Sequence, residues 1–579
     1  MRSRHVHPLC FTAFGLLLAG FCAAPATLAA DRGRPNVVIV MTDDQGYGDF
    51  GVHGNAKVRT PHLDRFAREG VRFTRFYVSP VCAPTRASLL TGRYHYRTGV
   101  IHTSRGGAKM HGEEVTLAER LGRAGYRTGV FGKWHLGDNF PMRPRDQGFR
   151  ESLVHKSGGI GQTPDRPNSY FDPLLWHNGK RTRAKGYCTD VFFAAALRFI
   201  EGNREKPFFV YLATNAPHTP LEVAKEYSEP YRKLGLNETT AKVYGMVRNI
   251  DENFGRLLAK LDELKLRDDT LLIFLTDNGP QQRRFNAGLR GRKGTTYEGG
   301  IRVPCFVQWP AKWKGGRRID RIAAHIDLLP TVLEACGVKA AAKPKLDGIS
   351  VLPLLDGTGK DWPDRRLYFQ CHRGLTPEPF RNIAVVTQRF KLVGGPGTFG
   401  KPAKAGAKPV LELYDLAAGP SESTNLIAKH PRIARQLEDA YRTWFTDVKA
   451  TRQFTPGIIH VGSEAGSFRH GEDPVHLCRY QDATYRDGTP RGWPVKIVRG
   501  GRYRLTFRRG SLTGAGTLVV TWKGRTTRHP LPADGNAIDV TLSAGDSTLD
   551  VRFIDSDGKP RIIHDNSTTG DVTLRFLRK

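Results

Sequence analysis

The run Val37-Val38-Ile39-Val40-Met41-Thr42 leads directly into two carboxylates, Asp43 and Asp44. Short apolar runs of this kind alternate with longer helical stretches between about residues 35 and 337. Such alternation is typical of strands and crossover helices around a largely parallel sheet. Ligands bind these sheets beyond the carboxyl ends of the strands. The run therefore predicts an α/β fold whose functional groups lie at one edge of a central sheet.

Three further apolar runs end in polar residues of the same kinds. Residues 271–276 are followed by Asp277 and Asn278, residues 129–132 by Lys133-Trp134-His135, and residues 208–212 lead through Asn215-Ala216-Pro217 to His218. At a single strand end, polar residues can simply mark where the chain leaves the core. All four ends carry metal-type oxygens, Lys or His, so we expect them to converge on one site.

The chemistry of these groups predicts a metal centre beside an anion site. Oxygen ligands from four residues suit a hard cation, and Ca²⁺ fits better than Mg²⁺ because so many protein oxygens leave few positions for water. Positive or proton-donating groups beside the metal could hold a tetrahedral oxyanion. The oxygen ligands are Asp43, Asp44, Asp277 and Asn278, and the surrounding groups are Lys133, His135, His218 and Lys293.

The rest of the chain predicts additional domains. A helix is expected over 240–264, where apolar residues recur every three or four positions. Short β-like runs after residue 363 precede a helix expected over 433–448, and beyond about Thr455 short alternating runs indicate an antiparallel β-sandwich, for glycan binding or for packing. The expected division is a signal peptide at 1–30, an α/β catalytic domain at 31–363, an α+β subdomain at 364–454 and an accessory sandwich at 455–579.

The first thirty residues predict export. Arg2 and Arg4 precede an apolar run over 10–24 and a small-residue stretch at 26–30, the layout of a secretory signal peptide. The run is shorter than the roughly 20 residues of a membrane span, and no later run approaches that length. We therefore expect a secreted or periplasmic protein without a transmembrane anchor.

The net charge and the cysteine pattern limit the classes of binding partner and structural site that we expect. The formal net charge of +33 becomes +31 when Arg2 and Arg4 are removed with the signal peptide, and such a basic surface attracts polyanions. No compact run of Lys and Arg is interleaved with aromatics, so we expect no nucleic-acid partner and favour sulfated or carboxylated glycans. The six remaining cysteines are scattered without C-x-x-C pairs, which predicts neither a disulfide framework nor a zinc ribbon.

The predicted metal and anion site lacks an obvious nucleophile, and one of these cysteines is the candidate for it. Cys82 begins the segment Cys82-Ala83-Pro84-Thr85-Arg86-Ala87-Ser88-Leu89-Leu90-Thr91-Gly92. A lone cysteine is often a buried structural thiol. This segment, however, resembles the signature of the type I, formylglycine-dependent sulfatases, which are arylsulfatase A-like members of the alkaline phosphatase superfamily. Segments similar to that family follow in the same order at 132–137, 216–218, 276–279 and 293–304.

The resemblance implies a modified residue and a set of metal ligands. In this family the cysteine is oxidised to formylglycine (3-oxoalanine), and Pro84 and Arg86 occupy the positions that the formylglycine-generating maturation enzyme reads. By position, the metal ligands are Asp43, Asp44, Asp277, Asn278 and the modified residue 82. The implied fold is an alkaline-phosphatase-like, largely parallel sheet flanked by helices, extending from about residue 35 to about residue 448.

The resemblance also implies a mechanism. One hydroxyl of the hydrated aldehyde attacks sulfur and expels the alcohol, and the second then loses a proton, with His135 as the acceptor, so that sulfate leaves. Asp277 is the expected base for the attack, and Lys293 or His218 protonates the leaving oxygen. Lys133 stabilises the sulfate charge and Arg86 the modified residue. The expected substrate-binding residues are Lys133, His218 and Lys293.

Two other functions remain open at this stage. A phosphodiesterase or phosphonate monoester hydrolase of the same superfamily would use the same fold and nucleophile on a similar oxyanion. A secreted binder of sulfated glycans with an inactive site is the non-enzymatic alternative. The intact site positions favour a sulfatase, and the basic surface with its extra domain favours a sulfated polysaccharide or oligosaccharide as substrate.

Overall fold

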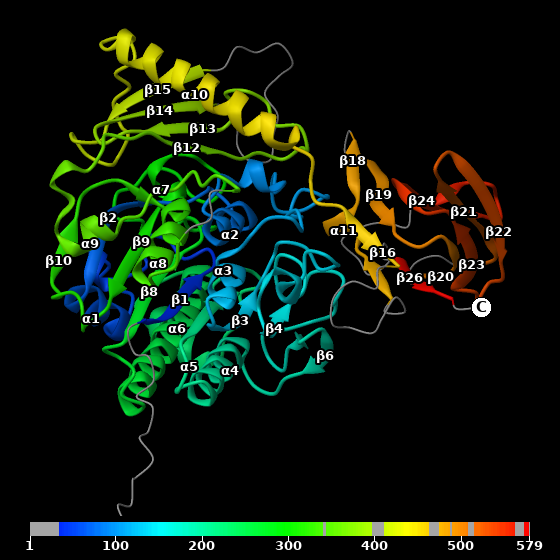
Figure 1. The fold of residues 1–579 in the computed structure, drawn as a ribbon, viewed down its shortest axis with the longest axis horizontal. Coiled ribbons are helices and arrows are strands. Elements are labelled where there is room, and N and C mark those ends of the chain that lie inside the picture. Colours follow the sequence, from blue (N-terminus) through cyan, green and yellow to red (C-terminus); the bar gives the residue numbers. More distant parts are fainter. Residues whose placement is uncertain are drawn as a thin grey trace, which may run out of the picture.

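The computed structural model describes residues 34–339, 343–395, 410–462, 474–486, 489–507, 514–561 and 572–577. The expected signal peptide at 1–30 lies outside the described residues. The described part forms a helix-flanked central sheet, a smaller sheet above it and two terminal sheets to one side (Figure 1).

The central sheet has eleven strands in the order β10-β2-β9-β8-β1-β7-β3-β4-β5-β6, with β11 paired to β2. Its middle is parallel, whereas β9, β5 and β6 add antiparallel pairings toward the two sides. The strands are β1 Asn36–Thr42, β2 Val71–Tyr77, β3 Arg127–Lys133, β4 Glu151–His155, β5 Leu174–His177, β6 Lys180–Arg183, β7 Phe208–Ala213, β8 Thr270–Thr276, β9 Arg302–Gln308, β10 Arg317–Ile319 and β11 Ala323–Ala324. The predicted mixed α/β fold is therefore confirmed.

The four apolar runs singled out in the sequence are neighbours in this sheet. They form β8, β1, β7 and β3, which lie side by side and run parallel. Val38 is opposite Leu272 on one side and Val210 on the other, and all three are fully buried. Because the four strands point the same way, their carboxyl ends meet at one edge of the sheet.

Helices cover both faces of the sheet, as the alternation of β1 requires. Val37, Ile39 and Met41 join one hydrophobic cluster, whereas Val38 and Val40 join the other. The first cluster packs against α2 Cys82–Thr91, α3 Leu117–Arg123, α8 Leu328–Ala335 and α9 Leu352–Asp356. The second packs against α1 Pro61–Glu69, α4 Cys188–Gly202 and α6 Glu238–Glu263, and α5 Lys225–Lys233 lies on α6. The short α7 spans Glu298–Ile301.

Three more sheets follow the central one. Strands β12 Leu367–Gln370, β13 Ile383–Val386, β14 Phe390–Gly395 and β15 Val410–Asp415 form an antiparallel sheet with α10 Pro431–Arg452. The terminal region has a seven-stranded and a four-stranded sheet that share one hydrophobic cluster, the expected sandwich, although β16 pairs with β19 in parallel. Its elements are β16 Ile459–Val461, β17 Val475–Leu477, α11 Arg479–Asp482, β18 Thr484–Arg486, β19 Thr489–Ile497, β20 Gly501–Phe507, β21 Gly516–Trp522, β22 Arg525–Leu531, β23 Ala537–Leu542, β24 Gly545–Asp555, β25 Pro560–Arg561 and β26 Val572–Phe576.

None of the described helices is both long enough and apolar enough to cross a bilayer. The described cysteines, Cys82 among them, are all buried.

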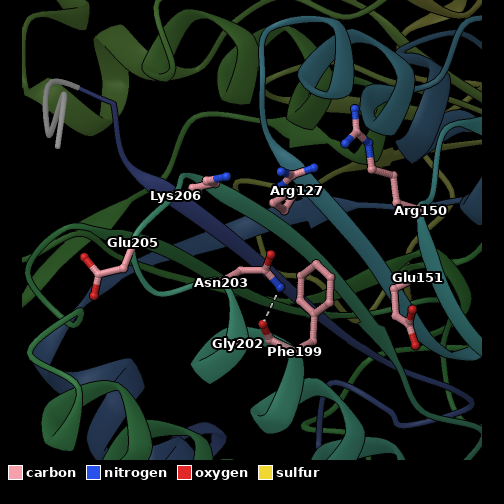
Figure 2. A pocket seen from close by; sticks show the side chains of 8 residues that line it. All are labelled: Arg127, Arg150, Glu151, Phe199, Gly202, Asn203, Glu205 and Lys206. Atoms are coloured by element: carbon pink, nitrogen blue, oxygen red, sulfur yellow. Dashed lines mark hydrogen bonds between the residues drawn. The ribbon is translucent and has the colours of Figure 1, made fainter.

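A hollow of about 440 Å³ opens at the amino edge of the central sheet, opposite the carboxyl ends of the parallel strands (Figure 2). Arg127 and Glu151, the first residues of β3 and β4, lie at its wall together with Arg150 and Lys206. The ring of Phe199 from α4 also faces it. This hollow is far from the strand ends that carry the predicted site, since β3 alone is about 20 Å long.

Candidate active site

The carboxyl ends of β8, β1 and β7 are joined by backbone hydrogen bonds. The N–H of Asp277 donates to the carbonyl of Thr42 at 3.0 Å, and the N–H of Asp43 donates to the carbonyl of Ala216 at 3.2 Å. The N–H of Asp44 also donates to the Asp277 carboxylate at 3.2 Å. These bonds bring the polar residues that follow three separate strands into one cluster.

Each carboxylate of the cluster faces a cation. Arg86 Nη2 lies 2.7 Å from Asp277 Oδ2 and 3.8 Å from Asp43 Oδ2. Lys133, the last residue of β3, forms an ion pair with Asp43. Lys293 Nζ lies 2.6 Å from Asp44 Oδ1. The three carboxylates, Arg86 and Lys133 are fully buried, so each charge depends on its partners rather than on water.

Burial and neighbouring charges shift these groups in opposite directions. For Asp43, burial opposes ionisation, but Lys133, His218 and Arg86 together hold the pKa of the carboxyl below its ordinary value. For Asp277, burial and the charge of Asp43 raise the pKa despite the nearby Arg86. Two adjacent carboxyls whose pKa values are pushed apart are typical of acid–base sites.

Cys82 is the first residue of α2 and is buried beside this cluster. Ligand atoms of Cys82, Asp43 and Asp277 lie within 4.8 Å of one another. Burial raises the pKa of the thiol, although Lys133 and Lys293 act in the opposite direction. Because the thiolate is the nucleophilic form of cysteine, an unmodified Cys82 is poorly suited to attack.

The segment after Cys82 is fixed to the same strand ends. Thr85 Oγ1 donates to the carbonyl of Asp277 at 2.7 Å, and Arg86 Nη1 donates to the carbonyl of Lys133 at 3.1 Å. A helix N-terminus carries partial positive charge, which favours an anion beside residue 82. The signature segment therefore holds its first residue against both the carboxylates and the cations.

The two predicted histidines have defined ring orientations. His218 Nδ1 contacts the carbonyl of Thr219 at 2.6 Å, which directs Nε2 to Asp44 Oδ2 at 3.8 Å. His135 Nε2 contacts the carbonyl of Thr103 at 2.8 Å, and its buried Nδ1 has no hydrogen-bond partner among the described residues. A carbonyl can only accept, so in each ring the nitrogen facing it carries the proton.

The oxygen atoms present fit a hard cation. Asp43 Oδ1, Asp44 Oδ2 and Asn278 Oδ1 are buried and lack a hydrogen-bond partner among the described residues. Asn278 Nδ2 donates to the other oxygen of Asp44 at 2.8 Å, which orients both groups. Buried oxygens without partners are costly unless something binds them. Carboxylate and amide oxygens are the type of ligand that Ca²⁺ and Mg²⁺ prefer.

Two site residues adopt backbone conformations that are unusual for side-chain-bearing residues. Asp44 has φ of 62° and His135 has φ of 60°. Such left-handed residues cost energy and cluster at functional sites. Each is the second residue after the end of its strand, β1 for Asp44 and β3 for His135, at the carboxyl edge of the sheet.

The predicted site residues thus fall into one region. Cys82, Arg86, Lys133, His218 and Lys293 have direct contacts or close atoms within the carboxylate cluster, as do the four oxygen ligands. His135 is held at Thr103, and its ring lies against Gly158, whose neighbour Gly159 lies against His218.

Sequence reasoning missed three neighbours of the site. Gln45 is fully buried next to Asp44, and neither polar atom of its side chain has a partner among the described residues. Arg284 bonds the carbonyl of Asp44 at 2.9 Å and the carboxylate of Asp49 at 2.6 Å. Gln45 could have been found because it directly follows the two carboxylates, whereas the backbone carbonyl of Thr103 has no sequence signature.

Comparisons with known proteins agree with this geometry. The family model described as Sulfatase matches residues 35–338, and the model of the C-terminal part of N-sulphoglucosamine sulphohydrolase matches residues 292–444. Arylsulfatase A of Homo sapiens is 33% identical over 525 residues, which cover 80% of this chain and 96% of that protein. N-acetylgalactosamine-6-sulfatase of Canis lupus familiaris is 32% identical over 395 residues, or 62% of this chain and 72% of that protein.

A solved structure extends the likeness to three dimensions. The crystal structure of Ps i-CgsB in complex with k-i-k-neocarrahexaose has a TM-score of 0.63 and 29% identity, and the match covers 71% of this chain and 92% of that one. The Sulfatase model alone spans more than half of the sequence. The chain therefore belongs to the sulfatase family of sulfuric ester hydrolases.

Proposed function

We propose that the chain is an exported sulfatase that uses formylglycine, made from Cys82, to remove sulfate from a sulfated polysaccharide or oligosaccharide. The observation that carries this proposal is the position of Cys82 at the start of α2, with its sulfur among the ligand atoms of Asp43 and Asp277. A residue placed there could reach both a cation and an oxyanion. Its own thiol is disfavoured as a nucleophile because burial raises the pKa.

The oxygens of Asp43, Asp44, Asp277 and Asn278 would hold the divalent cation. Together with a hydrated aldehyde at residue 82, that cation would supply an acidified hydroxyl as the nucleophile. The unpartnered oxygens of three of these residues support this ligand set.

Asp277 is suited to accept the proton of the attacking group. Burial and Asp43 raise the pKa of its carboxyl, and a base works best when its pKa lies near the working pH. Arg86 and the N–H of Asp44 hold one carboxylate oxygen each, so the group cannot rotate away. This orientation favours proton transfer at a fixed position over residue 82.

The cations of the site are suited to bind the sulfate group and stabilise its charge. Lys133 and Lys293 are held against Asp43 and Asp44 and would face the substrate oxygens from two sides. Lys293 Nζ would donate a proton to the leaving oxygen, and His218 Nε2 would do so only in the imidazolium form, because Nδ1 holds the proton of the neutral ring. His135 presents an unprotonated Nδ1, which suits it to accept a proton when sulfate departs.

Charge and relatives support a glycan substrate. The formal net charge of +33 attracts sulfated polymers, and Ps i-CgsB was solved with an oligosaccharide bound. N-acetylgalactosamine-6-sulfatases are named for a sulfated sugar. The layout of residues 1–30 supports export, which would bring the enzyme into contact with such polymers.

Two measurements test the proposal together. The first is the mass of the tryptic peptide 76–86 from protein matured in its native host, which should carry an aldehyde in place of the Cys82 thiol. The second compares kcat/KM on matched aryl sulfate and aryl phosphodiester substrates, with Cys82→Ala as control. An unmodified Cys82 thiol in active protein would contradict the formylglycine mechanism. Faster cleavage of the phosphodiester than of the sulfate ester would favour the phosphodiesterase alternative.

A further inference from the structure

The segment 478–483 of the terminal region lies against the loops of the active site (Figure 1). We propose that this segment, which contains α11, is a positioning element that holds His135 in its working orientation through the loop 102–109. The inference rests on the proposed function, because it assumes that His135 accepts a proton. It makes the terminal sheets part of the catalytic unit rather than an accessory module.

A hydrogen bond to the loop 102–109 sets the orientation of the His135 ring. The ring is buried and His135 Nε2 donates to the carbonyl of Thr103 at 2.8 Å. This single contact selects the tautomer with a free lone pair on Nδ1. A shift of Thr103 would release the ring to rotate or to exchange its proton between the two nitrogens. The position of the loop therefore decides whether His135 is ready to act as a base.

The loop 102–109 is in turn held by α11. The N–H groups of Arg105 and Gly106 donate to the carbonyls of Tyr480 and Gln481, both at 2.7 Å. Gly106 has φ of 80°, and a Cβ added there would lie 3.3 Å from the carbonyl oxygen of Ala483. The loop thus follows the backbone of α11 closely, two residues after Thr103.

At the far end of the loop, the charged side chain of Lys109 also contacts the segment 478–483. Its ammonium is buried and donates to the carbonyl of Asp482 at 3.0 Å. Burial lowers the pKa of Lys109 to about 8, against the effect of Asp482. A water-sized cavity of about 10 Å³ lies between this pair, Asp138 and His135. Polar groups of the terminal region therefore line the same small space as His135.

Helix α11 is held by strands of the terminal sheets. Arg479 Nη2 donates to the carbonyl of Val551 in β24 at 3.1 Å, and its guanidinium lies 4.7 Å from the ring centre of Trp493 in β19. The loop that carries His135 is also tied to this region, since Asn139 Nδ2 donates to the carbonyl of His476 at 2.8 Å. The terminal sheets are thus connected both to the loop that carries His135 and to the loop that holds it.

Lys109→Met tests the connection, because methionine keeps an unbranched apolar stem but loses the ammonium that bonds the carbonyl of Asp482. We expect kcat on a small aryl sulfate to fall about tenfold with KM unchanged, since misplacing a catalytic group by about 1 Å can cost up to 10²-fold. His135→Ala alone should lower kcat by about 10²-fold or more.

The double variant separates positioning from general damage. If the segment acts through His135, adding Lys109→Met to His135→Ala lowers kcat no further. A second tenfold loss in the double variant would overturn the inference while leaving the role of His135 intact. Full activity of His135→Ala would instead remove the proton acceptor from the proposed function, and the two failures are therefore distinguishable.

A glycine pair keeps the inference testable if Lys109→Met does not fold. Gly106→Ala adds a methyl group against α11, whereas Gly235→Ala imposes similar backbone strain, with φ of 75°, where nothing lies within 4 Å of the added Cβ. We expect kcat to fall severalfold for Gly106→Ala and to stay unchanged for Gly235→Ala, both measured on the full chain. Equal activity of the two variants would contradict the inference.

Discussion

The two ends of β3 carry cations in opposite settings. Lys133, at the carboxyl end, is fully buried and paired with Asp43. Arg127, at the amino end, lies beside the open hollow, and no carboxylate within 4 Å of it or of Lys206 is found among the described residues. The two glutamates of that hollow pair with residues that do not line it, since Glu151 contacts His177 at 2.5 Å and Glu205 contacts Arg204 at 3.3 Å.

The two edges differ in how far their charged groups are exposed to water, not in how many charged groups they have. At the amino edge water can solvate each cation, so the cations need no particular neighbour. At the carboxyl edge the charges are removed from water, so each must be matched by an opposite charge or a bound ion. Buried charged groups shift the pKa values of their neighbours and hold them in fixed orientations. Functional sites are therefore found where charged groups are buried together, as at the carboxyl edge.

Removal of Arg86 should have the largest effect on stability. Arg86→Met keeps the side-chain volume near β1 but leaves Asp277 without its 2.7 Å partner. Breaking a buried ion pair from one side typically costs about 3–5 kcal/mol, and we expect a loss of that order in the free energy of unfolding. Urea denaturation of metal-free protein measures it.

Arg86→Lys is the matched variant for this prediction. It keeps the charge but not the two-pronged contact with Asp277 and the carbonyl of Lys133. We expect it to recover part of the stability and little of the activity. A stability of Arg86→Met equal to that of the unchanged protein would show that the buried pair is not needed at this edge.

Metal removal should have the next largest effect. Chelation leaves Asp43 Oδ1, Asp44 Oδ2 and Asn278 Oδ1 without a ligand to bind, so activity should vanish and the Tm should fall. A ligand at 100 times its Kd contributes about 2.7 kcal/mol, which sets the scale of the change. Restoration by Ca²⁺ at lower concentration than by Mg²⁺ would support the calcium assignment, and the reverse order would contradict it.

Acid should destabilise the carboxyl edge through His155, the last residue of β4. Burial lowers the pKa of this histidine to about 3, and its Nε2 has no partner among the described residues. The unfolded chain, with a pKa of about 6.5, then binds more protons than the folded chain between about pH 6.5 and 3. Stability is therefore complete above pH 6.5 and is lost as the pH falls through that window.

His155→Gln isolates this contribution. The variant cannot take up a proton, so its stability should depend on pH less steeply than that of the unchanged protein, by about 3 kcal/mol between pH 6.5 and 4. Urea denaturation at a series of pH values gives both curves. Parallel curves for the two proteins would show that His155 does not contribute to the acid response.

The strand ends were predictable because apolar runs and the residues after them are both visible in the sequence. The positions of Asp43, Lys133 and Asp277 at one edge follow from four parallel strands pointing the same way. The contacts of Thr103 and α11 were not predictable, because backbone carbonyls make them and every residue has one. The reacting groups can be recognised in the sequence by their side-chain type, whereas the backbone groups that position them cannot.

Substitutions at the amino edge should have the smallest effect. In Arg127→Ala with Lys206→Ala, two cations are lost where neither has a carboxylate partner among the described residues. Exposed charges of this kind contribute about 0.5 kcal/mol or less, so the Tm and kcat on an aryl sulfate should stay unchanged. If this variant lost as much stability as Arg86→Met, burial would not be what separates the two edges, because the same strand would then depend equally on the cations at both of its ends.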